Sequence, residues 1–223
     1  MEKIVRRAIN ADRMGVLIRC LQQSEKTGLV LSQPEVLRHM IQGLRDRAQR
    51  YQWSGGATAK SLKEAQTIAA LLESPNHGTG RYIRPSDPRR SPEVVAVFLE
   101  LAAVYSFKHQ DGADADGKVK AYTERLLACL EAHPEKLQPE SKAPPTKGPV
   151  WEMLYGVPLW HGLMLARKVL GERGLPRSDM CLRVEGDYKA GLENLAAALE
   201  ARQPEEGTYG DQALRYWREC ERG

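Results

Sequence analysis

Cysteine, aromatic residues and long apolar runs are all scarce in this chain of 223 residues. No two of the four cysteines form a Cys-x-x-Cys pair, and they stand at Cys20, Cys129, Cys181 and Cys220. Such wide spacing argues against a zinc ribbon, a redox motif or a disulfide scaffold. It predicts buried free thiols in a reducing intracellular compartment. Because no run of 18 apolar residues exists, the sequence also predicts no membrane-spanning segment.

Aromatic residues make up 6% of the chain and only two of them are Phe, so the core must be built from Leu, Ala, Val and Met. This composition suits helices better than strands. No segment alternates apolar and polar residues with enrichment in β-branched side chains, as a strand would. The sequence therefore predicts an all-α protein of about eight helices, arranged as antiparallel pairs in a short α-solenoid or an irregular helical bundle.

Apolar residues at steps of three and four, together with capping residues, place these helices. Pro34 and Pro92 each stand in the first turn of a helix. One helix, over residues 92–109, is apolar on most of its circumference, which predicts a central position. Pro158 either kinks the sixth helix or splits it in two. The expected ranges are 2–24, 34–51, 61–74 (or from Thr58), 92–109, 117–133, 151–170, 178–201 and 208–222.

Two regions of different charge are joined by a segment rich in proline. Residues 1–110 hold 17 Lys and Arg against 10 Asp and Glu, whereas residues 111–223 hold 16 against 19. A basic half suggests an anionic partner, and a plain solvated surface is the alternative. Five prolines within 134–149 predict an extended linker. We therefore expect a basic helical subdomain over 1–133 and a second helical subdomain over 150–223.

The stretch over 185–200 resembles the second half of a tetratricopeptide repeat. A Gly-Asp-Tyr run at 186–188 leads into a helix that ends on Ala-Leu-Glu. Ala190 and Gly191 supply the small residues that a close approach of two helices requires. The resemblance covers about half of one repeat, because a turn over 173–176 stands where the first helix of the pair should run. It implies a degenerate helical repeat that stacks on its neighbours and presents a groove or a concave face.

The segment around Asp114 and Asp116 resembles the middle of a calcium-binding EF-hand loop. Gly112 would occupy the first position of that loop and Thr123 the twelfth, so two principal ligands are missing. The alternative interpretation is an acidic turn that caps the following helix. We therefore expect no metal site, with Asp114 and Asp116 as the candidates should one exist, and no cofactor.

Motifs for catalysis and for nucleotide binding are missing from the sequence. It contains neither a Gly-x-Ser-x-Gly elbow nor a Gly-x-x-x-x-Gly-Lys-[Ser/Thr] loop, and none of the five histidines stands beside a nucleophile at a recognisable spacing. His39 and His161 fall within helices, where a packing or surface role is expected. No small-molecule substrate is indicated. An enzyme whose active site is assembled across the fold stays open as a further interpretation.

Arginines gather at two places in the basic half. Trp53 and Tyr82 stand near them, and arginine next to aromatic rings suits a surface that binds phosphates and bases. The alternative is that each arginine is solvated or pairs with a carboxylate such as Asp46 or Asp87. The candidate RNA-contacting residues are Arg45, Arg47 and Arg50 in the helix over 34–51, and Arg81, Arg84, Arg89 and Arg90 in the loop over 75–91.

Two interpretations of function follow. The first is a non-enzymatic helical-repeat scaffold that binds a protein partner along a groove or concave face. The second is an RNA-associated helical-repeat protein of an organelle or a ribonucleoprotein, similar in architecture to pentatricopeptide-repeat proteins. Because no second copy of a 35-residue unit exists, RNA contact would be electrostatic and would use the basic N-terminal half.

The N-terminal segment is basic and amphipathic, which is typical of a mitochondrial transit peptide or of a first structural helix. A cytoplasmic and a mitochondrial location therefore both stay open.

Overall fold

A computed structural model describes residues 2–78, 80, 87–136 and 148–222. Within these residues the chain forms ten α-helices and no strand, which confirms the predicted all-α fold. The helices are α1 (Glu2–Asn10), α2 (Met14–Gln22), α3 (Ser24–Thr27), α4 (Pro34–Arg50), α5 (Gly55–Leu72), α6 (Pro92–His109), α7 (Lys118–Glu131), α8 (Gly148–Gly174), α9 (Ser178–Glu200) and α10 (Tyr209–Glu221), with 3₁₀ helices η1 (Pro88–Arg90) and η2 (Pro134–Lys136).

The N-terminal third contains more helix breaks than the sequence predicts. The single helix expected over 2–24 is divided into α1, α2 and α3, and Asp12 takes a positive φ of 53° at the first break. α5 begins at Gly55, three residues before Thr58 and six before Ser61, the two residues expected to start this helix. Both are buried within α5 and neither caps it. Tertiary packing here overrides the low helix propensity of glycine.

α8 passes through Pro158 without ending there, and its break lies at Gly171. Gly171 has φ 66° and ψ 163°, a conformation that glycine adopts readily and other residues rarely do. Pro158 is buried. Pro158 therefore does not split the helix in two, and the helix expected over 151–170 ends directly before the break at Gly171.

α6 is the central helix, as its apolar circumference predicts. Every residue from Val94 to Val104 is buried, and α6 packs against α4, α5, α7 and α8. A helix with four helical neighbours is typical of an irregular bundle. α6 comes close to α8 at Gly162, where an added Cβ would lie 3.1 Å from the backbone nitrogen of Glu100.

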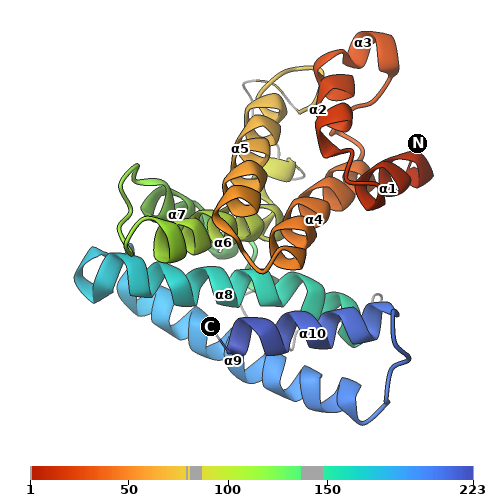
Figure 1. The fold of residues 1–223 in the computed structure, drawn as a ribbon. Coiled ribbons are helices and arrows are strands. Elements are labelled where there is room, and N and C mark those ends of the chain that lie inside the picture. Colours follow the sequence, from red (N-terminus) through yellow and green to blue (C-terminus); the bar gives the residue numbers. More distant parts are fainter. Residues whose placement is uncertain (1, 79, 81–86, 137–147, 223) are drawn as a thin grey trace.

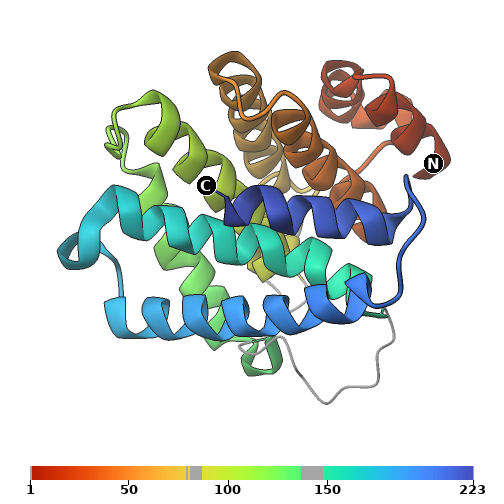
Figure 2. The ribbon, with the colours of Figure 1, turned by 60° about the horizontal axis from the view of Figure 1, so that its bottom comes forward.

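α8, α9 and α10 lie side by side as a layer, and the N-terminal helices stand across it (Figures 1 and 2). The indole of Trp217 on α10 lies 4.8 Å from that of Trp160 on α8, and both are buried. The segment resembling a tetratricopeptide repeat lies entirely within α9, which packs against α8 and α10. None of the described helices combines the length and apolar character that crossing a bilayer requires.

The division into two subdomains stays a prediction. α6 and α8 belong to different predicted subdomains, and they pack against each other. Most of the predicted linker, residues 137–147, lies outside the described residues. Cys129, Cys181 and Cys220 are buried free thiols as expected, and Cys20 is half-buried.

Candidate nucleic-acid interface

Two of the predicted RNA-contacting arginines lie inside the protein. Arg45 is 0% exposed and Arg47 is 5% exposed, so the expectation that both belong to an exposed surface is wrong. The physical reason is that α4 is covered on more than one side, since it packs against α1, α5 and α6. Arg50, at the last position of α4, is exposed and keeps its place among the candidates.

Arg47 ties α4 to α5. Its Nη2 donates to Glu64 Oε2 at 2.5 Å, and its Nε and Nη2 donate to Ser61 Oγ at 3.2 and 3.0 Å. Its Nη1 lies 3.9 Å from a carboxylate oxygen of Asp12, in the turn between α1 and α2. A buried guanidinium with these partners joins α4 to α5 and to the turn between α1 and α2, and it is unable to reach an RNA phosphate.

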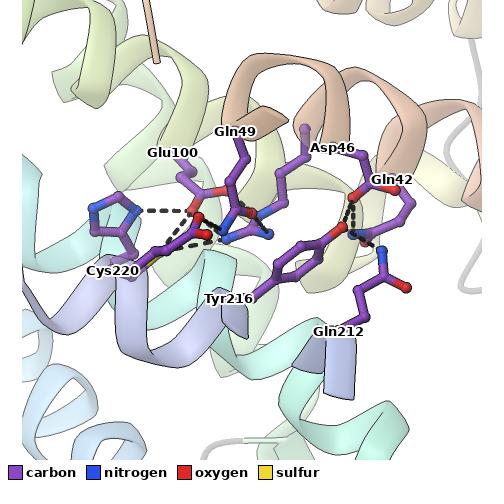
Figure 3. A network of polar contacts seen from close by, with 10 residues as sticks. Gln42, Asp46, Gln49, Glu100, Gln212, Tyr216 and Cys220 are labelled. Carbon is purple, nitrogen blue, oxygen red and sulfur yellow. Dashed lines mark hydrogen bonds and ion pairs between the residues drawn. The ribbon is translucent and has the colours of Figure 1, made fainter. Parts of the chain in front are cut away.

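Arg45 forms a buried ion pair with Glu100 of α6. Its Nε and Nη2 donate to the two carboxylate oxygens of Glu100 at 2.6 and 2.9 Å, and its Nη1 donates to Gln49 Oε1 at 2.7 Å. The guanidinium lies 4.4 Å from the ring centre of Tyr216 on α10. Figure 3 shows Glu100 and Gln49 on one side of this cluster and Tyr216 on the other.

Arg45 and Glu100 each shift the pKa of the other toward the charged form. Burial acts to lower the pKa of Arg45, but Glu100, Cys220 and Tyr216 together outweigh burial and raise it. Burial likewise acts to raise the pKa of Glu100, and Arg45 and His161 outweigh it and lower it. Both groups are therefore ionised at neutral pH, and each depends on the other because an unpaired charge in the interior is strongly unfavourable.

His161 and Cys220 complete the cluster. His161 Nδ1 lies 2.8 Å from Glu100 Oε1, and Cys220 Sγ lies 3.9 Å from the same oxygen. The ligand atoms of Glu100, His161 and Cys220 lie within 4.8 Å of one another, a spacing that could suit a metal ion. However, Arg45 already occupies both oxygens of Glu100, and its Nη2 lies 3.5 Å from Cys220 Sγ. A bound cation would therefore face the guanidinium, so the arrangement favours an internal charge network over a metal site.

This network predicts a loss of stability at alkaline pH. Burial acts to lower the pKa of His161, but Cys220 and Glu100 outweigh it and raise the pKa to about 9 from an ordinary value of 6.5. A pKa raised on folding gives stability that is complete below pH 6.5 and is lost as pH rises through 9. We expect the free energy of unfolding to fall by up to about 3 kcal/mol over this window.

Urea unfolding at half-unit pH steps would measure this effect. The control is His161→Gln, which should be less stable than the wild type at pH 6.5 and should show a much smaller decline up to pH 9. This pH window ends near 9, because burial raises the pKa of the Cys181 thiol to about 12 from 9. Above pH 9 this thiol also lowers the free energy of unfolding as pH rises. Equal declines in the two proteins would show that His161 is not the titrating group.

A second polar network links α4 to α10 beside the first. Tyr216 donates from its hydroxyl to Asp46, and Gln42 donates to the same carboxylate oxygen at 2.8 Å. Gln49 donates to Glu219 of α10. Figure 3 shows Asp46, Gln42, Tyr216 and Gln212 grouped beside the Glu100 cluster. Burial raises the pKa of Asp46, which its hydrogen bonds only partly oppose.

A basic hollow opens over these networks, between the C-terminal ends of α4, α6 and α10. It has a volume of about 570 Å³. Four basic side chains line it, together with the carboxylates of Asp46 and Glu219, and Trp53 and Tyr216 form part of its wall. The basic residues are Arg50, Lys108, Arg215 and Arg222, all of them exposed.

The four candidate arginines of the loop over 75–91 differ in their positions. Arg81 and Arg84 lie outside the described residues. Arg89 is half-buried, and its Nε and Nη2 donate to the two carboxylate oxygens of Asp87 at 3.0 and 2.7 Å. Pairing with Asp87 is the alternative to RNA contact that the sequence suggests. Arg90 is half-buried and lines a separate pocket. The described part of the loop thus does not join the basic hollow.

Asp114 caps α7. Its two carboxylate oxygens accept hydrogen bonds from the backbone amides of Val119 and Lys120, both at 3.0 Å. Asp116 accepts from the backbone amide of Lys118 and pairs with its side chain. This geometry matches the predicted capping turn, with Asp114 as the residue that reaches the helix.

The first three helices and the turn between α1 and α2 carry six exposed basic side chains. One of them, Arg6, lies 3.6 Å from Glu2. The other five form no salt bridge within the described residues, and we call these five the N-terminal cations. Ile4 and Val16 stand among them and are 65% and 42% exposed. The N-terminal cations are Lys3, Arg7, Arg13, Arg19 and Lys26.

The sequence interpretation missed Glu100, Lys108 and Arg222. Glu100 carried a usable signal, because a carboxylate in the middle of an otherwise apolar helix requires a buried cation. Lys108 and Arg222 carried none, because they are distant in sequence and meet only through the packing of α6 and α10 beside α4.

The chain is similar to a family of known proteins. The family model for mitochondrial ribosomal protein mS27 matches residues 1–219. No curated protein matches the chain.

Proposed function

Because the chain belongs to the mitochondrial ribosomal protein mS27 family, we propose that it is a structural component of the mitochondrial ribosome and binds ribosomal RNA in the mitochondrial matrix. Its N-terminal cations contact RNA phosphates. The family match supports the RNA-associated organellar interpretation over that of a general adaptor. The match over nearly the whole chain is the observation that carries this proposal.

The exposed charges support an electrostatic mode of binding. The N-terminal cations are free of salt bridges within the described residues, so they can approach phosphates without first breaking an ion pair. Contacts of this kind position a protein on RNA without reading its sequence. The exposed side chains of Ile4 and Val16 would add apolar contact with a neighbouring molecule.

Protein neighbours form the other part of the proposed environment. A second hollow, of about 720 Å³, lies between α1, α4 and the layer of α8 and α10. Its lining includes Trp151, Tyr155 and Tyr209, and Tyr209 is 48% exposed. Exposed aromatic residues are enriched where proteins bind one another. The groove-binding scaffold is thus retained as a contact to another ribosomal protein.

RNA binding is tested by fluorescence anisotropy of a labelled single-stranded RNA of about 20 nucleotides at several salt concentrations. The variant Lys3→Gln/Arg7→Gln/Arg13→Gln/Arg19→Gln should bind more weakly, and its log–log salt slope should be smaller by about 3. It should fold normally because all four side chains are exposed. A wild-type protein that does not bind this RNA even at low salt would overturn the proposal of RNA contact.

Assembly is tested separately by sedimenting mitochondrial lysate that contains tagged protein. We expect the tagged chain to migrate with ribosomal particles and to move to the top of the gradient after ribonuclease treatment. Migration at the top without ribonuclease would argue against a ribosomal role. Co-sedimentation of the four-site variant would show that contacts other than those of the N-terminal cations hold it in the particle.

A further inference from the structure

The basic hollow offers three cations that have no salt bridge in the described part of the chain. Arg50 and Lys108 lie in α4 and α6, Arg222 directly follows α10, and all three line the same hollow. Arg215 also lines it, but its Nε lies 3.4 Å from Asp211. Leaving aside His161, which pairs with Glu100, the lining holds four Lys and Arg side chains against two carboxylates, an excess of two positive charges.

Both carboxylates in the lining are held by neutral groups. Asp46 is hydrogen-bonded by Tyr216 and Gln42, and Glu219 by Gln49. Burial raises the pKa of Asp46, although its hydrogen bonds and the charges of Arg45 and Arg50 act to lower it. The acids therefore stabilise the fold between α4 and α10 and leave the exposed cations available to an anionic ligand.

The wall of the hollow gives no free aromatic surface among its described residues. Trp53 and Tyr216 are each 7% exposed, and Arg45 lies against both rings, 5.8 and 4.4 Å from their centres. Bases stack on aromatic faces that are open. This hollow can therefore recognise a charged backbone, and it has no means of stacking a base.

We propose that the basic hollow is a second RNA-binding site, distinct from the N-terminal cations, in which Arg50, Lys108 and Arg222 bind backbone phosphates. The volume of about 570 Å³ lies in the range of pockets that hold molecules of nucleotide size. This inference rests on the proposed function. Binding here is independent of sequence, because phosphates are alike in every RNA.

The test compares Arg50→Gln/Lys108→Gln/Arg222→Gln with the wild type in the anisotropy assay. We expect affinity to fall about 100-fold at ~0.1 M salt, and the salt slope to fall by about 2, in RNAs of different sequence alike. Glu219→Gln should change affinity in the opposite direction, since it removes a negative charge from the lining. Because Arg222 is exposed near the chain end, Arg222→Gln alone serves as the test should the triple variant not fold.

The matched control is Arg173→Gln/Arg183→Gln/Arg202→Gln, which removes the same charge from exposed positions outside the hollow, and none of these three arginines has a salt bridge within the described residues. It should lose far less affinity than the hollow variant. Equal losses in the two variants, or RNA binding by the hollow variant at wild-type strength, would overturn the hollow as a site and leave the proposed function intact. A wild-type protein that binds no RNA would overturn both.

Discussion

Replacing Glu100 with Gln is expected to destabilise the protein by about 3–5 kcal/mol, since it breaks a buried ion pair on one side only. The Arg45 guanidinium would stay in the interior, 0% exposed, with no negative charge beside it. His161 would also lose the carboxylate that its ring nitrogen contacts at 2.8 Å. For a chain of this length, the melting temperature should fall by about 6–20 °C.

The double variant Arg45→Met/Glu100→Gln tests whether the unpaired charge causes the loss. It removes both ionised groups and keeps an amide oxygen near His161, so at least half of the lost stability should return. The matched control is Glu93→Gln, on the same helix, which is half-buried and pairs with Lys136 at 2.6 Å. That change should remove no more than about 1 kcal/mol. A Glu100→Gln protein as stable as this control would contradict the prediction.

The helices of this protein were largely predictable from the chain because their signals are local. Pro34 and Pro92 mark the starts of α4 and α6, and the apolar circumference of α6 predicts its central position. Such signals depend on residues within a few turns of each other. The break at Asp12 was not predicted, because no proline stands beside it to mark a break, whereas the helix expected over 151–170 ends directly before the break at Gly171.

The polar interior was not predictable in the same way. The apolar stripe of α4 shows which face enters the core, but it does not show that other elements will cover the opposite face. Arg45 and Tyr216 are in contact although 171 positions separate them. Glu100 was the one local clue, and it indicates the need for a buried cation without identifying which arginine supplies it.

The basic hollow illustrates the same limit for function. Arg50 was predicted as an RNA contact from its place in a basic helix, but Lys108 and Arg222 become its neighbours only through the packing of α6 and α10. Arg222 belongs to the half of the chain with more acids than bases. Charge counted along a sequence therefore predicts that an anionic partner exists, whereas the position of the binding surface depends on the fold.

Trp217→Ala is expected to weaken RNA binding although Trp217 does not line the basic hollow. Its indole is 4% exposed and packs 4.8 Å from Trp160, which fixes α10 against α8. Removing it should lower the free energy of unfolding by about 3–5 kcal/mol. Because α10 is the last helix and packs mainly against α8 and α9, much of this loss should appear as local opening of α10.

Such opening would displace Arg222 and expose Cys220, which is 1% exposed in the folded protein. We expect Trp217→Ala to bind RNA as weakly as Arg222→Gln or more so, and its Cys220 to react with a thiol reagent much faster than in the wild type. Trp217→Phe keeps an aromatic contact to Trp160 and should retain most of both properties. If Trp217→Ala exposes Cys220 but binds RNA at full strength, the position of α10 does not determine binding, and Arg222 is not an RNA contact.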